Sequence, residues 1–267
     1  MRRRTYLATA LAGVALPALA GCIGDLETAV DSRTLDEVGP ESTLTVQNRN
    51  GDVTVEGEER ADGHLEVTKR TRWGIDLDRV GVSVEASDGS VTIAPDVPSD
   101  IDRGRVSIDV DLRVPRTVAV ETVSTRNGFV DVAHVGGDPT VDTVNGDVDV
   151  RDLDGTLVAA TTNGDVTVGR TAGLSELRTT NGEIDAEVHA VPSEASVRTT
   201  NGDIGIAFAD GVGCELDVTL TNGEISTEGL ALSGASVGGN RLEAALGGGG
   251  PTYRVGTVNG DIELTRL

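Results

Sequence analysis

A hexapeptide repeat limits this chain to few folds, and its clearest copy runs from Thr161 through Asn163-Gly164 to Val166. Neighbouring Asn-Gly pairs from Asn127 to Asn181 are 18 residues apart, and the next two intervals are 20 and 21 residues. The pairs that define the repeat are Asn127-Gly128, Asn145-Gly146, Asn163-Gly164, Asn181-Gly182, Asn201-Gly202, Asn222-Gly223 and Asn259-Gly260, with an earlier one at Asn50-Gly51. A period of this length without a helical pattern indicates stacked β-coils.

Aligning the copies on asparagine gives each position of the repeat a physical role. The third residue after asparagine is always valine or isoleucine, and the second is acidic in every copy except the one with Phe129. Successive strand residues point to opposite faces, so the third position faces a core and the second faces solvent. We predict an all-β, single-domain β-solenoid of about 18–21-residue coils, with short stacked strands and Asn-Gly corners at which both residues accept positive φ.

An antiparallel meander with Asn-Gly hairpins is the competing topology, because two strands and two turns also fit the period. The columns of identical residues favour the solenoid. In-register stacking places identical residues of successive coils side by side, and ladders of Asn and Thr gain hydrogen bonds from these identical neighbours. Thr143, Thr161, Thr179 and Thr199 share one such column.

The folded domain is expected to span residues 42–267, with irregular coils up to about residue 120. Asp88-Gly89 and Asn240 are interpreted as degenerate copies of the corner, and Gly247 to Gly250 as a loop. The last copy, after Asn259, is expected to end the stack.

The first 21 residues are interpreted as a signal peptide. Arg3 and Arg4 begin a twin-arginine-like export signal, and an apolar stretch too short to span a membrane follows. Leu19-Ala20-Gly21-Cys22 resembles a lipobox, so we expect Cys22 to carry a lipid that anchors the protein on the outer face of the cytoplasmic membrane, facing the extracellular side. Residues 22–41 are then expected to form a tether, and the sequence leaves open whether the tether contains a short helix. A soluble secreted protein is the alternative.

The charge balance indicates adaptation to molar salt rather than disorder. The net charge is −22, only 2% of the residues are aromatic, and Lys69 is the only lysine. Molar salt shortens the Debye length to roughly 3 Å, so self-repulsion costs little. Disorder has a similar composition but not regular columns of valine. So acidic a surface repels phosphate, and no nucleic-acid partner is expected.

The repeat T-x-N-G-D-[VI], with Leu112-Arg113-Val114-Pro115 before it and a glycine-rich approach to the last copy, resembles a bacterial and archaeal family of unknown function known as putative adhesins. The resemblance covers about residues 42–267. It implies a β-solenoid, often on lipoproteins or membrane-tethered chains, and it carries no catalytic residues. We therefore expect a non-catalytic, adhesin-like or structural surface lipoprotein. An envelope scaffold or sensor subunit for a membrane partner is the first alternative, and a glycan-active β-helix enzyme is the second.

No residue cluster predicts a catalytic, cofactor or metal site. His64, His134 and His189 lack metal-ligand spacing, and Cys214 has no partner base. The acidic column could be bridged by Ca²⁺, but hydrated residues that accept backbone N–H groups are the favoured interpretation. Its members are Asp147, Asp165, Glu183, Asp203 and Glu224.

Arg70, Arg72 and Trp73 form the one basic and aromatic cluster in the sequence. Tryptophan and arginine dominate interface hot spots, so the cluster could contact an unidentified surface protein or glycan. The competing interpretation is that Trp73 caps the N-terminal end of the stack.

Overall fold

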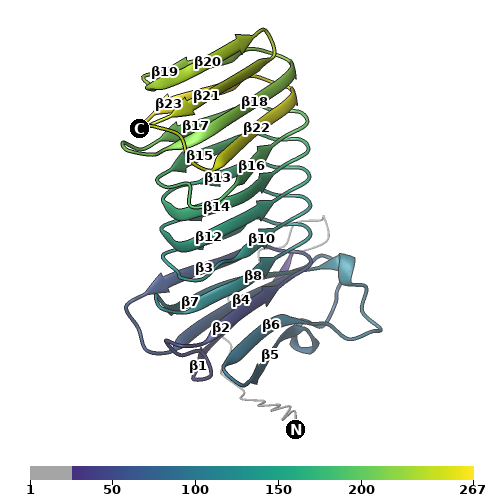
Figure 1. Cartoon of the computed structure of the whole chain (residues 1–267). Helices are drawn as coiled ribbons and strands as arrows, with labels where there is room; N and C mark the ends of the chain where they lie inside the picture. Colours follow the sequence, from purple (N-terminus) through teal and green to yellow (C-terminus); the bar gives the residue numbers. More distant parts are fainter. Residues whose placement is uncertain (1–25) are drawn as a thin grey trace.

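The protein is described by a computed structural model that covers residues 26–267, so the predicted export signal at Arg3 and Arg4 and the lipid site at Cys22 lie outside the described residues. The described chain forms two long β-sheets that face each other along one elongated stack (Figure 1). No helix in residues 26–267 is long and apolar enough to cross a membrane.

Each sheet collects strands that are far apart in the sequence. In spatial order, sheet A contains β1 (Glu27–Leu35), β4 (Gly63–Thr71), β7 (Val106–Pro115), β3 (Val53–Glu58), β9 (Val130–Ala133), β11 (Val148–Arg151), β13 (Val166–Val168), β15 (Ile184–Val188), β17 (Ile204–Phe208), β23 (Ile262–Arg266) and β19 (Ile225–Glu228). Sheet B contains β20 (Leu232–Gly238), β21 (Arg241–Leu246), β18 (Cys214–Asn222), β22 (Thr252–Asn259), β16 (Ala195–Arg198), β14 (Thr171–Arg178), β12 (Leu153–Ala160), β10 (Thr140–Asp142), β8 (Ala119–Ser124), β2 (Thr43–Gln47), β6 (Ser90–Asp96) and β5 (Gly81–Ser87).

Strands that follow consecutive Asn-Gly pairs are parallel neighbours, which confirms the β-solenoid and rules out the meander for this part of the chain. β9, β11, β13, β15 and β17 pair in register, so Val148 lies between Val130 and Val166, and Ile184 follows Val166. Each coil therefore supplies one strand to each sheet, and the repeat columns become ladders along the stack.

The core lies between the two sheets and consists mainly of small branched side chains. The predicted inward positions, from Val53 to Ile262, are buried in every coil except the one after Asn222, where Ile225 in β19 is half-buried. Two aromatic rings also enter the core, because Phe208 and Tyr253 are 1% and 0% exposed and meet edge to face with centroids 5.6 Å apart.

Glycine is required at each corner because the next coil passes very close to it. The eight corner glycines have φ between 121° and 158°, a conformation that only glycine adopts readily. A Cβ on Gly164 would lie 2.0 Å from the carbonyl oxygen of Gly146 in the neighbouring coil. The preceding asparagines do not share this conformation, so the prediction that both corner residues have positive φ was wrong for asparagine.

Asparagine instead forms a ladder along the edge of the stack. The Nδ2 group of Asn163 donates to Oδ1 of Asn145 at 2.8 Å, and Asn181 donates to Asn163 at 2.9 Å. A second ladder is internal, because the buried hydroxyl of Thr161 donates to the carbonyl oxygen of Gly146 at 2.9 Å. Asn-Gly is thus conserved among the coils because stacking requires it at every level.

The last coil does not end the stack, in contrast to the prediction. β22 lies between β16 and β18, and β23 lies between β17 and β19. Asn259 accordingly bonds to Asn201 and accepts from Asn222, each at 2.8 Å. The C-terminal coil thus inserts between the coil at Asn201 and the coil at Asn222, although it comes last in the sequence.

Two predicted corners are hairpin turns instead. Asp88-Gly89 joins the antiparallel strands β5 and β6, with φ values of 52° and 81°, as expected of a two-residue hairpin. Asn240 lies in the turn between the antiparallel strands β20 and β21. Gly247 to Gly250 form the predicted loop, which connects β21 to β22.

The folded part begins before residue 42, so the tether interpretation of residues 22–41 was wrong for most of that range. β1 pairs antiparallel with β4 from Glu27↔Thr71 to Leu35↔Gly63 and forms the edge of sheet A. Leu35 and Val38 are buried in the core. The polar residues of β1 concealed a strand whose backbone hydrogen bonds, rather than its side chains, attach it to the sheet.

Lys69 closes the N-terminal end of the stack. The chain crosses there from β4 to β5 through the 3₁₀ turn η1 (Leu77–Arg79). The buried Nζ group of Lys69 donates to the carbonyl oxygens of Leu77 at 2.9 Å and Val80 at 3.1 Å, and pairs with Asp31 at 2.7 Å. The only lysine of the chain therefore fastens the segment that covers this end.

Candidate functional site

The acidic column serves the corners of the stack. Oδ1 of Asp147 accepts the backbone N–H of Asp165 at 2.9 Å, and Oδ1 of Asp165 accepts that of Glu183 at 2.8 Å. The same bond occurs from Phe129 to Asp52, from Asp261 to Asp203 and from Glu224 to Asp261. These carboxylates satisfy peptide groups that the corner would otherwise leave unpaired, which is a structural role.

The histidines and the described cysteine lie in separate surroundings. His134 contacts Glu56 at 2.7 Å and Asp152 at 3.2 Å, whereas His64 contacts Ser32 and His189 contacts Glu187. Within residues 26–267, no three His, Cys, Asp or Glu side chains lie together as metal ligands would. Cys214 is fully buried, and burial raises its thiol pKa to about 11, so it stays protonated at neutral pH.

The predicted contact residues Arg70, Arg72 and Trp73 lie at the N-terminal end of sheet A and have different roles. Trp73 is 57% exposed, so it does not cap the core as the competing interpretation required. Arg72 is exposed beside it, whereas Arg70 forms an ion pair with Asp109 of β7. The charge of Arg70 is therefore offset by Asp109, whereas Arg72 forms no ion pair with a described residue.

The 3₁₀ turn η2 (Arg103–Arg105) adds two arginines to this cluster. The carbonyl oxygen of Arg105 accepts a hydrogen bond from the hydroxyl of Thr71, and its guanidinium lies 5.8 Å from the ring centroid of Trp73. This distance is typical of a cation–π contact. Arg103 lies at the other end of the turn, where its carbonyl oxygen accepts from Asn50, the last rung of the asparagine ladder, at 2.6 Å. Arg49 directly precedes Asn50 in the sequence, and we call Arg49, Arg72, Trp73, Arg103 and Arg105 the basic corner.

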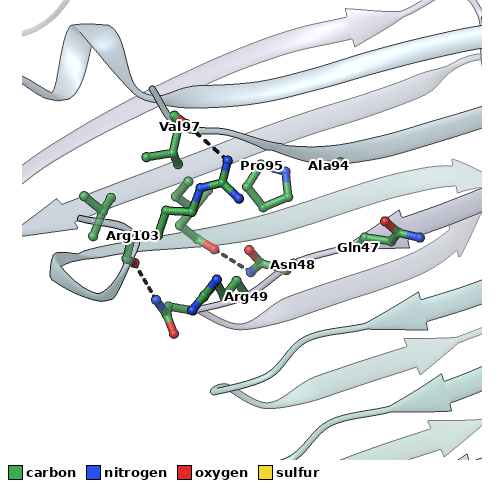
Figure 2. A pocket seen from close by; sticks show the side chains of 10 residues that line it. Gln47, Asn48, Arg49, Ala94, Pro95, Val97 and Arg103 are labelled. Atoms are coloured by element: carbon green, nitrogen blue, oxygen red, sulfur yellow. Dashed lines mark hydrogen bonds between the residues drawn. The ribbon is translucent and has the colours of Figure 1, made fainter. Parts of the chain in front are cut away.

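A hollow of about 260 Å³ opens at the basic corner, between the end of the asparagine ladder and the segment that leads to η2 (Figure 2). Figure 2 shows the Arg103 side chain beside Val97 and Pro95, opposite Asn48. The guanidinium of Arg103 donates to the carbonyl oxygen of Val97 at 3.5 Å. The lining residues are Gln47, Asn48, Arg49, Asn50, Ala94, Pro95, Val97, Arg103, Val106 and Ile108. The floor of the hollow is thus formed by apolar and amide side chains, and the guanidinium groups of Arg49 and Arg103 lie at its margin.

Asn48 leaves a hydrogen-bond acceptor without a partner in this hollow. It occupies the column that holds threonine in most coils, and its Nδ2 group donates to the carbonyl oxygens of Ile108 at 2.7 Å and Gly51 at 3.1 Å. Those two bonds fix the orientation of the amide, because a flipped amide would place oxygen against oxygen. Oδ1 is buried and accepts no hydrogen bond from the described residues.

Arg49 and Arg103 stand out in a chain with a net charge of −22. Neither forms an ion pair with any residue of the described chain, whereas Arg105 pairs with Asp102. Neither residue was predicted from the sequence, because both are remote from Trp73 along the chain. A signal was present: Arg49 and Arg126 occupy the position before asparagine that is threonine or valine in every other coil.

The stacked parallel coils and the corner ladders define a β-solenoid repeat protein. The family follows from the sequence match. The model of the Toastrack DUF4097 family matches residues 34–265, and the chain belongs to that family. No curated protein matches the sequence.

Several solved structures are similar to this chain. A putative adhesin from Bacteroides fragilis has 14% identity, covers 90% of this chain and 97% of its own, and gives a TM-score of 0.44. A putative adhesin from Parabacteroides distasonis has 12% identity, coverage of 91% and 98%, and a TM-score of 0.44. A putative lipid binding protein from the same species has 13% identity, coverage of 89% and 96%, and a TM-score of 0.38.

Proposed function

We propose that this protein is an exported, lipid-anchored, non-catalytic surface protein that binds carboxylate-bearing glycans at its basic corner. The observation that carries the binding proposal is the pair of guanidinium groups without acidic partners, beside a hollow, in a chain with a net charge of −22. The proposed absence of catalysis is supported by the acidic columns, whose carboxylates are engaged in holding the corners together.

The polar groups of the hollow match a uronate better than a neutral sugar. A guanidinium group binds a carboxylate through two parallel hydrogen bonds. These short contacts persist when salt screens the longer-range electrostatic attraction. Trp73, 57% exposed, adds an apolar surface of the kind that packs on sugar rings.

Reversing the charge of Arg103 tests this proposal. We expect Arg103→Glu to weaken retention on an immobilised polyuronate by roughly tenfold or more in molar NaCl, because a charge-assisted pair becomes a repulsion. The measurement is affinity chromatography or biolayer interferometry with polyuronate and a neutral glucan.

Arg178→Glu is the matched control, because Arg178 is exposed on sheet B and forms no ion pair with a described residue. Equal losses of polyuronate retention in Arg103→Glu and Arg178→Glu would show that the effect comes from net charge and not from the basic corner. Wild-type protein that binds the neutral glucan as well as the polyuronate would contradict the proposed specificity.

The lipid anchor is tested separately at Cys22. A thioether to a lipid needs the cysteine sulfur, so Cys22→Ser should move most of the protein from the membrane fraction to the medium. One acyl chain binds membranes only marginally, and stable anchoring requires two. Immunoblotting of the two fractions measures the change. Unchanged membrane association of the serine variant, with normal export, would refute the anchor.

A further inference from the structure

The two ends of the stack are finished differently. At the N-terminal end, η1 crosses between the sheets and Lys69 fastens it, so Leu77 and Val80 are buried. At the other end, sheet A ends at β19 and sheet B continues past β18 through β21 to β20, with β19 and β20 uppermost in Figure 1. We call β19 and β20, with the connection between them, the tip.

The tip exposes part of the inner face of sheet B. Val237 is opposite Leu242 and Leu232 is opposite Leu246 in the antiparallel pairing of β20 with β21. Opposite residues share a face of the sheet, and Leu242 and Leu246 are buried in the core. Val237 therefore points to the interior side, yet it is 75% exposed, the highest value among the large apolar side chains of the described chain.

The tip also has an edge strand without charge. The edges of the two sheets are β1 and β19 in sheet A and β5 and β20 in sheet B. Charged side chains on an edge discourage pairing with another strand, and three edges have them, including Asp31 in β1, Glu85 in β5 and Glu228 in β19. β20 has none in a chain of which 25% of the residues are charged.

We propose that the tip is a self-association surface, on which a second copy of this chain docks tip to tip through β20 and Val237. Two molecules with a charge of −22 approach most easily where the facing surfaces are uncharged, and β20 is such a surface. Antiparallel pairing of two identical strands is isologous, so each copy offers the same groups to the other and the pair is closed.

A bulge limits the extent of this contact. The pairing of β20 with β21 shifts register between Ser233 and Ser236, where Gly234 has a φ of 62°. Bulges interrupt ladders, so the regular edge available to a partner is the segment from Ser236 to Gly238. The resulting contact is small, and it gains strength where many copies are displayed together on one surface.

The proposed anchor gives this contact a direction, and this step rests on the proposed function. β1, which follows the anchor in sequence, lies at the end of the stack opposite the tip. Tip-to-tip pairing would therefore join molecules on two facing surfaces rather than neighbours on one surface, which is homophilic adhesion.

Sedimentation velocity of the full chain in detergent and molar NaCl tests the pairing without assuming where the protein is anchored. We expect a reversible monomer–dimer equilibrium that Val237→Asp weakens by tenfold or more. Val144→Asp is the matched control, because Val144 is 37% exposed beside the asparagine ladder in the middle of the stack, several coils from the tip; it should associate as the wild type does. Circular dichroism verifies that both variants are folded.

A wild-type chain that stays monomeric at up to roughly 1 mM, the weak end of measurable affinities, would overturn the proposal. A dimer that Val237→Asp leaves intact would also overturn it, because pairing would then use another surface. Failure of the Cys22→Ser experiment would remove the adhesive direction and leave the tip pairing standing, so the two proposals fail independently.

Discussion

Replacing Gly164 with alanine is expected to lower the free energy of unfolding by about 3–5 kcal/mol, because strain at an unfavourable φ and overpacking add together. The φ of Gly164 is +151°, and a Cβ there would lie 2.0 Å from the carbonyl oxygen and 2.5 Å from the carbonyl carbon of Gly146. Neither coil can move away without breaking the ladders on both sides. Denaturant unfolding in molar NaCl, followed by circular dichroism, measures the loss.

Gly81→Ala is the matched control for this prediction. Gly81 begins β5, its φ lies outside the left-handed region, and a Cβ there meets no atom within 4 Å. Alanine should be neutral or stabilise by up to about 1 kcal/mol, because it reduces the entropy of the unfolded chain. Equal effects at the two positions would show that backbone entropy, and not contact between coils, sets the requirement for glycine.

Replacing Lys69 with methionine is expected to cost about 1–3 kcal/mol of stability, because the carbonyl oxygen of Val80 loses its side-chain donor and that of Leu77 keeps only the backbone N–H of Val80. Methionine keeps the apolar stem but removes the donors to Leu77 and Val80 and the ion pair with Asp31. The segment that covers the N-terminal end should then loosen first. Hydrogen exchange of residues 75–80, together with denaturant unfolding, would measure both effects.

Arg126→Met provides the comparison, because Arg126 is exposed and forms no ion pair with a residue that the structure describes. Its replacement should change stability by less than about 0.5 kcal/mol, as is usual for surface positions. Lys69→Met with wild-type stability and exchange would show that apolar contacts of Leu77 and Val80 close the end without the lysine.

Much of the fold was predictable because stacking repeats the same physical requirement at every level. Valine at the third position and glycine after asparagine follow from one geometry, so a few copies predict the rest. Asp165 was predicted as a solvent-facing residue that accepts backbone N–H groups, and it has that role. The conformation of asparagine was not predictable in this way, because Asn-Gly is also the signal for a hairpin turn.

The departures from the prediction arise where pairing is non-local. The polar sequence of β1 does not reveal its partner β4, because backbone groups form the pairing. The insertion of β22 and β23 into the stack depends on which coil offers a free edge when they arrive, and a repeat pattern does not encode that order. The basic corner is similar, since Arg49 meets Arg103 at the hollow, and Trp73 meets Arg105, only after sheet A and η2 have formed.

The position of the last coil also sets the order in which the molecule can assemble. β18 pairs only with β21 and β22, and β19 pairs only with β23. The coil after Asn222 therefore has no strand of the stack to join until the final residues, up to Arg266, have been synthesised. Coils from Asn127 to Asn201 can add one by one as the chain emerges, but β18 to β21 must wait until β22 and β23 have been made. A chain that stops before Thr252 would leave β18 to β21 without backbone pairing to the rest of the protein.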